Sequence, residues 1–330
     1  MQLPYVYRVT KYDPVDRDER GHYTGTEDTV SDHGEVEAAY LRAVEAFAVE
    51  AGVDRLSVRE PQVPSLAHFS VERPLDGLGL VGLFPAGLAG VYDGAEVPLA
   101  IGLALVRLML RDSGVWCRLE AEGTFAVHVG WDQYLYIGSR RFCAEALTQT
   151  RALGLFPERL DASPYDMEAN GEDVQRPGDE DFWARLRRAV AAGRAGLLEE
   201  MYLEGASRWH HLALDTIDTV RAGLAPRARL AVWPDLSSDV DAVLSALPAE
   251  GLVECVWQGK DGRIHSAVAD EEAFPELTAR ISGADTKASA AMLLSVYAGE
   301  RAPLLTAVMP DSDGVVRARW QAQAAPSDRD

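Results

Sequence analysis

The sequence predicts an α+β protein built of two α/β-sandwich-like domains, the second of them ferredoxin-like. Segments that alternate apolar and polar residues, as half-buried strands do, are interspersed with segments that are apolar at helical spacing. The chain of 330 residues also exceeds what one hydrophobic core usually serves. An acidic stretch over 161–181, which contains prolines and glycines, has the composition of an exposed linker.

These observations divide the chain into four segments. We expect an N-terminal α+β domain over 1–160 and an acidic linker with helices over 161–225. A ferredoxin-like α+β domain is expected over 226–322, followed by a disordered tail over 323–330.

The first domain begins with a predicted strand over 5–12, in which aromatic residues and valines alternate with polar residues. After a charged loop, a helix is predicted over 35–51 and is closed by Gly52. Further helices are predicted over 97–111 and 144–153. Further strands are predicted over 55–59, 66–71, 116–121, 125–129 and 134–137.

Two helices, over 181–203 and 214–224, are predicted before the second domain. Its elements then follow in the order βαββαβ, which is typical of a ferredoxin-like fold. The predicted strands are 230–233, 252–257, 264–268 and 292–297, and the predicted helices are 238–247 and 271–281. An added hairpin joins 304–309 to 315–320 through a turn at Asp313-Gly314.

Charge and composition exclude several classes of function. The 32 lysines and arginines against 52 aspartates and glutamates give a net charge of −20, so long non-specific contact with DNA is not expected. Hydrophobic residues at 47% and a mean hydropathy of −0.12 are typical of an ordinary globular chain. The apolar region over 75–110 is interrupted by charges and glycines, so no membrane contact is expected either.

The cysteines and the N-terminus indicate a reducing compartment. Cys117, Cys143 and Cys255 form no Cys-x-x-Cys motif, so neither disulfides nor a metal centre is expected. Residues 1–4 lack the charged start and apolar run of a signal peptide. Because arginine far outnumbers lysine and alanine is frequent, the sequence is typical of a GC-rich bacterium. We expect a cytoplasmic location.

Two motifs match ligand-binding patterns only in part. Gly77-x-Gly79-x-x-Gly82 has the spacing of a dinucleotide fingerprint, but Pro85 and Gly87 interrupt the helix that should follow, so no cofactor is expected. The segment from Asp16 to Glu27 has acidic residues and a glycine at calcium-loop spacing. Arg20 occupies a ligand position there, so an acidic hairpin without a metal is the expected structure.

Histidines and a cysteine leave an enzyme as a competing hypothesis, with a site assembled from distant residues. His33, His128 and the pair His210-His211 carry the side chain that titrates nearest neutrality. Cys143 lies close to Arg140 and Arg141 near a predicted helix start, a setting that can lower a thiol pKa, but a buried structural thiol is the favoured interpretation. None of them lies in a recognisable catalytic spacing. The catalytic residues therefore stay unassigned, and a non-enzymatic protein is favoured.

One segment indicates RNA binding. Leu135-Tyr136-Ile137-Gly138 resembles the first RNP strand of the RNA-recognition motif, in which an aromatic side chain stacks on a base. Arg140 and Arg141 follow it in a part of the chain where acids and bases balance, while the second RNP strand has no match. The residues predicted to bind RNA are Phe125, Trp131, Tyr134, Tyr136, Arg140 and Arg141.

The chain as a whole also resembles a family of uncharacterised actinobacterial proteins that are often labelled RNA-binding. The resemblance rests on Tyr7–Pro14, Ser31–Gly34, Gly130–Tyr134 and Ala231–Leu236, which span the chain. It implies RNA binding without a defined mechanism and brings no catalytic residues.

The sequence therefore predicts a non-enzymatic binding or regulatory protein whose partner is a short single-stranded RNA or another protein. A further alternative is an acidic inhibitor of a basic enzyme, with a nucleic-acid-like surface. That surface would consist of Asp16, Asp18, Glu19, Glu27 and Asp28.

Overall fold

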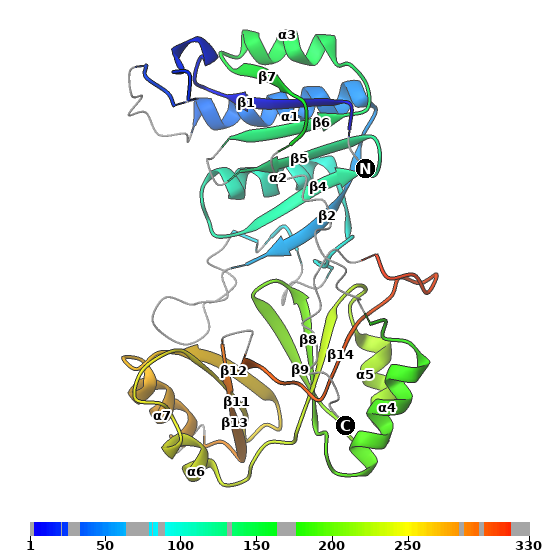
Figure 1. The fold of residues 1–330 in the computed structure, drawn as a ribbon, viewed down its shortest axis with the longest axis vertical. Coiled ribbons are helices and arrows are strands. Elements are labelled where there is room, and N and C mark those ends of the chain that lie inside the picture. Colours follow the sequence, from blue (N-terminus) through cyan, green and yellow to red (C-terminus); the bar gives the residue numbers. More distant parts are fainter. Residues whose placement is uncertain are drawn as a thin grey trace. The chain divides into compact units, whose positions relative to one another are not determined.

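The computed structural model describes residues 3–20, 22–25, 34–63, 79–80, 82–84, 90–130, 134–163, 176–283, 287–296 and 300–317. Helices occur together with antiparallel sheets, which confirms the α+β class (Figure 1). The chain forms two compact units. Unit 1 comprises Met1–Val63 and Leu78–Asn170, and unit 2 comprises Pro64–Gly77 and Gly171–Asp330.

Unit 1 is built on a seven-stranded antiparallel sheet with the order β3-β2-β4-β5-β6-β1-β7. Its strands are β1 (Tyr5–Thr10), β2 (Arg55–Gln62), β3 (Glu96–Pro98), β4 (Trp116–Ala121), β5 (Phe125–Val129), β6 (Leu135–Ser139) and β7 (Phe156–Leu160). The N-terminal strand β1 is inserted between β6 and β7, so it is paired along both edges. Strands β3 and β7, which complete the sheet, were not predicted.

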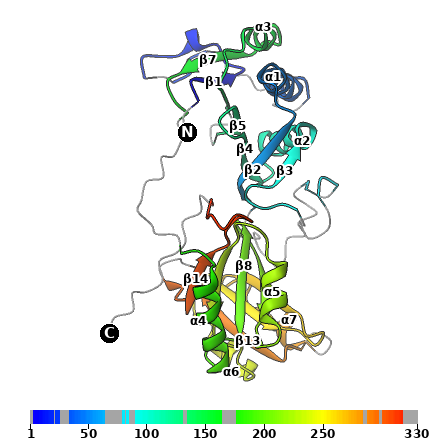
Figure 2. The same ribbon diagram turned by 90° about the vertical axis from the view of Figure 1, so that its right-hand side faces the viewer.

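Three helices cover one face of this sheet, as Figure 2 shows. They are α1 (Glu35–Ala51), α2 (Leu99–Leu110) and α3 (Ala144–Ala152). Gly52 ends α1 in the left-handed conformation with φ 76°, as the sequence predicts. Tyr7 of β1 packs against Phe47 of α1, with ring centroids 5.6 Å apart. The hydrophobic core of unit 1 therefore lies between the helices and this face.

Cross-strand pairing places a different set of residues on the opposite face of the sheet. Arg8 of β1 pairs with Tyr136 of β6, which pairs with His128 of β5. Directly opposed residues project to the same face of a sheet. A row of polar and aromatic side chains therefore crosses the sheet on the face turned away from the three helices.

Unit 2 contains two sheets packed between two pairs of helices (Figure 1). The four-stranded sheet has the order β14-β10-β8-β9 and the three-stranded sheet the order β12-β11-β13. Their strands are β8 (Leu197–Leu203), β9 (Ala206–His211), β10 (Arg229–Trp233), β11 (Val253–Gln258), β12 (Ile264–Ala269), β13 (Ala290–Ser295) and β14 (Leu305–Val308). The helices are α4 (Glu180–Ala191), α5 (Ile217–Gly223), α6 (Val240–Ser245) and α7 (Phe274–Ser282).

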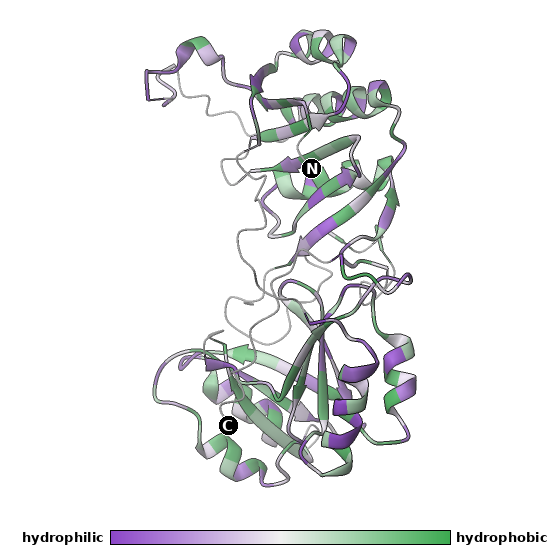
Figure 3. Ribbon diagram, turned by 45° about the vertical axis from the view of Figure 1, so that its right-hand side comes forward, coloured by the Kyte–Doolittle hydropathy of each residue, from purple (hydrophilic) through white to green (hydrophobic). Residues whose placement is uncertain are grey.

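Alternation along the strands explains this layering. On β11, Cys255 and Trp257 pack with Phe274 of α7, whereas Val256 packs with Leu197 of β8 and with the next sheet. The helices carry one hydrophobic and one hydrophilic side, visible as alternating bands in Figure 3. Each sheet of unit 2 therefore has one face on the other sheet and one face on a helix pair.

The ferredoxin-like prediction for 226–322 is wrong in its topology. A ferredoxin-like sheet requires β10 to pair within one sheet with β12 and β13, but β10 instead pairs with β8 and β14. The element order was predicted, whereas one of the two partners of β10, strand β8, lies in a segment that the sequence assigned to a helix over 181–203. That segment forms α4 and then β8, because Gly193 adopts φ 66° and ends the helix.

Other predicted elements differ in detail. The segment 176–225, expected within a linker, contributes α4, α5, β8 and β9 to unit 2. β14 coincides with the first strand of the predicted C-terminal hairpin, but 315–317 form no strand and 318–320 lie outside the described residues. The predicted strand 66–71 also lies outside them.

Candidate functional site

Two of the aromatic residues predicted to stack on RNA are buried. Phe125 is 1% exposed and projects into the core beneath the helices, because it lies on the same face of β5 as Val127 and Val129. Tyr136 is 4% exposed, and its ring is stacked on His128 with the planes 10° apart and the centroids at 5.2 Å. The prediction that these rings offer a surface for bases is therefore corrected: both belong to the packing of the sheet.

Of the two other aromatic residues predicted to bind RNA, the structure describes only Tyr134, whose ring is already in contact with two arginines. Tyr134 is half-buried, with the guanidinium of Arg8 at 5.6 Å and that of Arg17 at 5.3 Å from its ring centroid. Arg17 also donates a hydrogen bond to the Tyr134 hydroxyl at 3.2 Å. Trp131 lies outside the described residues.

Arg140 and Arg141 are exposed in the turn that follows β6. Their backbone is held in place: the Arg140 N–H donates to the Thr124 carbonyl at 2.8 Å, and the Arg141 N–H donates to Ser139 Oγ at 3.1 Å. No carboxylate of the described chain lies within 4.0 Å of either guanidinium. A fixed backbone therefore presents two positive charges that are not paired with a carboxylate of the described residues.

An exposed aromatic ring adjoins these arginines. Phe142 is 55% exposed, and its ring centroid lies 5.6 Å from that of Tyr5. The guanidinium of Arg159, on β7, lies over the Tyr5 ring at 4.9 Å from its centroid. The same group donates a hydrogen bond to the Pro4 carbonyl at 3.3 Å. We call these five residues the aromatic–arginine patch: Tyr5, Arg140, Arg141, Phe142 and Arg159.

Three members of the patch were missed by sequence reasoning. Tyr5 lies on β1, Phe142 follows β6 and Arg159 lies on β7. These residues come together only because β1 is inserted between β6 and β7, which are far from β1 in the sequence. The one local signal is Phe142 itself, a large apolar residue directly after two arginines. Such a residue is rarely left exposed without a reason when it is part of a cluster.

The arginines of the patch differ from six other arginines of unit 1, which are paired with carboxylates. Arg8, Arg55, Arg59, Arg107, Arg111 and Arg118 each have a carboxylate oxygen within 4.0 Å. Arg159 and the nearby Arg151 resemble Arg140 and Arg141 in having no such carboxylate among the residues described. Arginines without a carboxylate partner among the described residues, gathered at one end of a sheet, favour an anionic ligand even in a chain with a net charge of −20.

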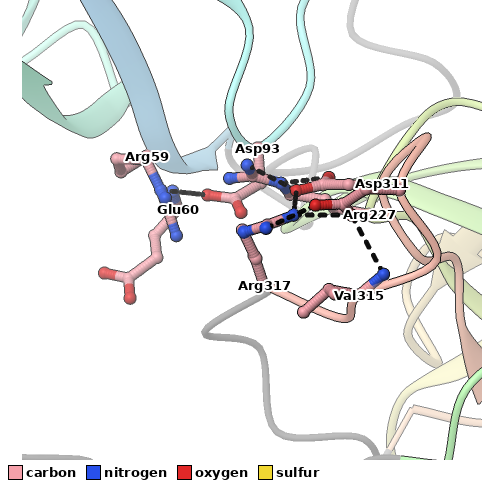
Figure 4. Close-up of polar contacts among 8 residues, drawn as sticks. Arg59, Glu60, Asp93, Arg227, Asp311, Val315 and Arg317 are labelled. Carbon is pink, nitrogen blue, oxygen red and sulfur yellow. Dashed lines mark hydrogen bonds and ion pairs between the residues drawn. The ribbon is translucent and has the colours of Figure 1, made fainter. Parts of the chain in front are cut away.

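Figure 4 shows what compensated arginines look like in this protein. In unit 1, Arg59 donates to the buried carboxylate of Asp93 at 3.0 Å, and Asp93 also accepts the Glu60 backbone N–H at 2.8 Å. In unit 2, the Arg227 guanidinium donates twice to Asp311, at 2.7 and 3.0 Å, and holds the pKa of that carboxyl below its usual range. These arginines stabilise loops and are not available to a ligand.

The helix that follows the patch provides no reactive thiol. The N-terminus of α3 is occupied by the Glu50 carboxylate, which accepts the Ala146 N–H at 2.7 Å. Cys143 is fully buried, its sulfur lies 3.5 Å from Ser139 Oγ, and burial raises the pKa of its thiol. The structure agrees with the favoured interpretation of Cys143 as a buried structural thiol, and the alternative of a lowered thiol pKa is wrong, because desolvation outweighs the Arg141 charge.

Two of the histidines considered for an enzyme, His128 and His210, are engaged in contacts within the fold, whereas His211 is exposed. His128 is 5% exposed, and burial, together with the charge of Arg118, lowers its pKa to about 3. The His128 ring is therefore uncharged at neutral pH. His210 lies 2.8 Å from the buried Glu200 carboxylate, which also accepts the Ala225 N–H at 2.7 Å. His33 lies outside the described residues.

Unit 2 holds a buried carboxylate pair that the sequence did not reveal. Glu199 of β8 and Glu254 of β11 face each other between the two sheets, and Arg301 donates to both, at 3.0 and 2.9 Å. Glu199 also accepts from Trp233 Nε1 at 3.0 Å and from Ser207 Oγ at 2.9 Å. Burial, followed by the Glu199 charge, raises the pKa of Glu254. Since both carboxylates are more than nine-tenths buried and fully partnered, they stabilise the interface of the sheets.

The remaining motifs form no ligand site in the residues described. Asp18 accepts the backbone N–H groups of Arg20 and His22 at 2.9 and 2.8 Å, which lowers its pKa and closes a tight turn. Glu27, Asp28 and Gly77 lie outside the described residues, whereas Gly79 and Gly82 adopt positive φ in turns. Within the described ranges, no three His, Cys, Asp or Glu side chains come close enough to hold a metal ion.

Two further findings bear on function. None of the helices over the described ranges combines the length and the apolar surface that a bilayer crossing requires. Comparison of the chain with protein-family models, with curated proteins and with solved structures finds no match.

Proposed function

We propose that the chain is a non-enzymatic binding protein that takes up short single-stranded RNA on the aromatic–arginine patch. One observation carries the proposal: Phe142 is exposed beside Arg140 and Arg141, and neither arginine has a carboxylate partner among the described residues. Exposed rings and unpaired arginines together are what proteins use to hold single strands.

Each component of the patch has a defined part in this proposal. Arginine guanidinium groups donate paired hydrogen bonds to phosphate oxygens, so Arg140, Arg141 and Arg159 would hold the backbone. Phe142, with Tyr5 behind it, would stack on a base, an interaction worth about 1–3 kcal/mol per base. Because the chain as a whole carries a charge of −20, phosphates beyond the patch are repelled on average, which favours a short target.

The sequence gives the proposal additional support. The chain as a whole resembles a family labelled RNA-binding, whereas the RNP-like segment Leu135–Gly138 contributes only its position next to the patch, because Tyr136 is buried. We propose a reducing cytoplasm as the setting, since Cys117, Cys143 and Cys255 are free thiols and all are buried.

Fluorescence anisotropy with a short 5′-labelled single-stranded RNA at low salt tests the proposal. Phe142→Ala is expected to weaken binding about tenfold, which corresponds to about 1.4 kcal/mol of lost stacking. Arg140→Ala combined with Arg141→Ala is expected to weaken it further. The logarithm of the association constant is expected to fall with that of the salt concentration with a slope of about −2, since three arginines each release about 0.7 counterions.

The matched control is Arg188→Ala, which removes an exposed arginine from a helix of unit 2 and is expected to leave binding unchanged. No saturable signal, or equal losses in the control and the patch variants, would overturn the proposal. Equal binding of a DNA strand of the same sequence would remove the preference for RNA. Tyr136→Ala is unsuitable, because Tyr136 is buried and its truncation would disturb the sheet.

A further inference from the structure

The outward face of α1 carries a groove that the RNA proposal does not use. The groove has a volume of about 490 Å³ and lies between α1 and α3. Its apolar lining consists of Ala46 and Val49 of α1, Ala152 of α3 and Leu153, which directly follows α3. Val49 is 66% exposed, although it is a large hydrophobic residue on a well-formed helix. The groove is thus an apolar surface left without a cover among the described residues.

Four residues of α1 form an outward stripe along this groove: Ala38, Arg42, Glu45 and Val49. Their spacings of four, three and four residues place them on one side of the helix. The same spacing is used where one helix packs along another. Arg42 and Glu45 are exposed, and neither has an ion-pair partner within 4.0 Å in the described part of the chain.

The stripe is complementary to itself when two copies run in opposite directions. A two-fold axis between residues 43 and 44 sets Arg42 of each copy opposite Glu45 of the other. The same axis sets the small Ala38 opposite the larger Val49. Closed dimers use one surface on both subunits in this reciprocal way. Opposite charges at matched positions fix the register of such a contact.

We propose that two copies of the chain associate through antiparallel packing of their α1 helices. Each α1 then lies over the groove between α1 and α3 of the other copy, which covers Val49. The occupant of the groove is thus a second copy of the chain. The aromatic–arginine patch takes no part in this contact, so the two proposals stand or fall separately.

Charge reversal at the stripe tests the dimer. Light scattering coupled to size-exclusion chromatography is expected to give a mass of roughly twice 35.9 kDa for the unaltered chain. Arg42→Glu alone sets like charges opposite each other and is expected to weaken the dimer at least tenfold, as is Glu45→Arg alone. The double variant Arg42→Glu with Glu45→Arg exchanges the charges and is expected to restore the dimer.

Mixing provides the sharpest form of the test. Equimolar Arg42→Glu and Glu45→Arg chains are expected to form a heterodimer, because every charge of one then faces its opposite on the other. Arg188→Glu serves as the control for charge reversal on an exposed helix and is expected to remain dimeric. A monomeric unaltered chain, or a dimer that the single variants leave intact, would overturn the proposal. Circular dichroism of each variant establishes that it is folded.

Discussion

Tyr136 and Phe142 lie six residues apart, yet only Phe142 has the exposure that a ligand needs. Tyr136 is stacked on His128 within the sheet, whereas Phe142 follows the last residue of β6 and emerges at the sheet's end. The arginines divide in the same way, since Arg59 and Arg118 are paired with carboxylates and Arg140 and Arg141 are not. At single positions, burial and pairing therefore separate side chains that stabilise the fold from those that are available to a ligand.

The Tyr7 hydroxyl is buried and has no hydrogen-bond partner among the described residues. An unsatisfied buried hydroxyl costs about 1–3 kcal/mol, so Tyr7→Phe is expected to raise the free energy of unfolding by on the order of 1 kcal/mol. Tyr40→Phe is the matched control: the Tyr40 hydroxyl accepts the Lys11 N–H at 2.9 Å, and its loss is expected to destabilise the protein. Urea denaturation measures both, and a less stable Tyr7→Phe would contradict this account.

His128 should make the protein sensitive to acid. Its pKa of about 3 in the folded state lies below the value of about 6.5 in an unfolded chain. Between these values the unfolded state binds a proton that the folded state does not, so stability falls by about 1.4 kcal/mol per pH unit as pH decreases. His128→Phe keeps a ring against Tyr136 and removes this titration.

Urea unfolding at pH 7 and pH 5 therefore measures the contribution of His128. The unaltered protein is expected to lose about 2 kcal/mol more than His128→Phe between these two pH values. Other titrating groups are shared by the two proteins and cancel in the comparison. Identical losses would show that His128 does not titrate as inferred.

The local sequence pattern predicted whether a segment is a helix or a strand better than it predicted which strands pair with each other. The helices α1, α2 and α3 and the strands β4, β5 and β6 lie close to their predicted ranges, because capping and periodicity are local properties. The strands β3, β7, β8 and β9 were missed. In β8 the reason is that two of its buried residues are glutamates whose partners lie on other elements. The aromatic–arginine patch could not be predicted for the same reason, since the pairing of β1 with β6 and β7 brings Tyr5 next to residues more than 130 positions away in the sequence.

Arg301 should be the residue on which the contact between the two sheets of unit 2 depends most. Arg301→Met leaves Glu199 and Glu254 buried without their shared cation, and removal of one partner from a buried ionic network costs about 3–5 kcal/mol. The pKa of Glu254, which is already raised, rises further in this variant. The folded state then takes up a proton more readily than the unfolded state as pH falls, so the deficit is expected to shrink from pH 7 to pH 5.

Chemical denaturation at these two pH values tests the role of Arg301. Replacing both glutamates by glutamine in the Arg301→Met background removes the uncompensated charges and is expected to recover part of the lost stability. If the triple variant is as destabilised as Arg301→Met alone, Arg301 acts through packing and not through its charge.

The molecule as a whole combines a strongly acidic surface with one basic, aromatic end of the unit 1 sheet. Of the groups that the sequence offered for catalysis, His128 and Cys143 are buried and His210 is paired with the buried Glu200 carboxylate. The groove along α1 and the exposed Phe142 remain as surfaces that suit partners, a second copy at the first and RNA at the second. Binding on separate surfaces is thus the common theme of both proposals.

Photo-cross-linking tests the central proposal most directly. A short single-stranded RNA carrying a photoreactive uridine is irradiated with the protein, which is then digested with trypsin and analysed by mass spectrometry. Cleavage after Arg141 and Arg151 isolates Phe142 in the peptide 142–151, and cleavage after Arg8 isolates Tyr5 in the peptide 1–8. The account predicts RNA adducts on these two peptides, and adducts confined to peptides from 176–317 would contradict it.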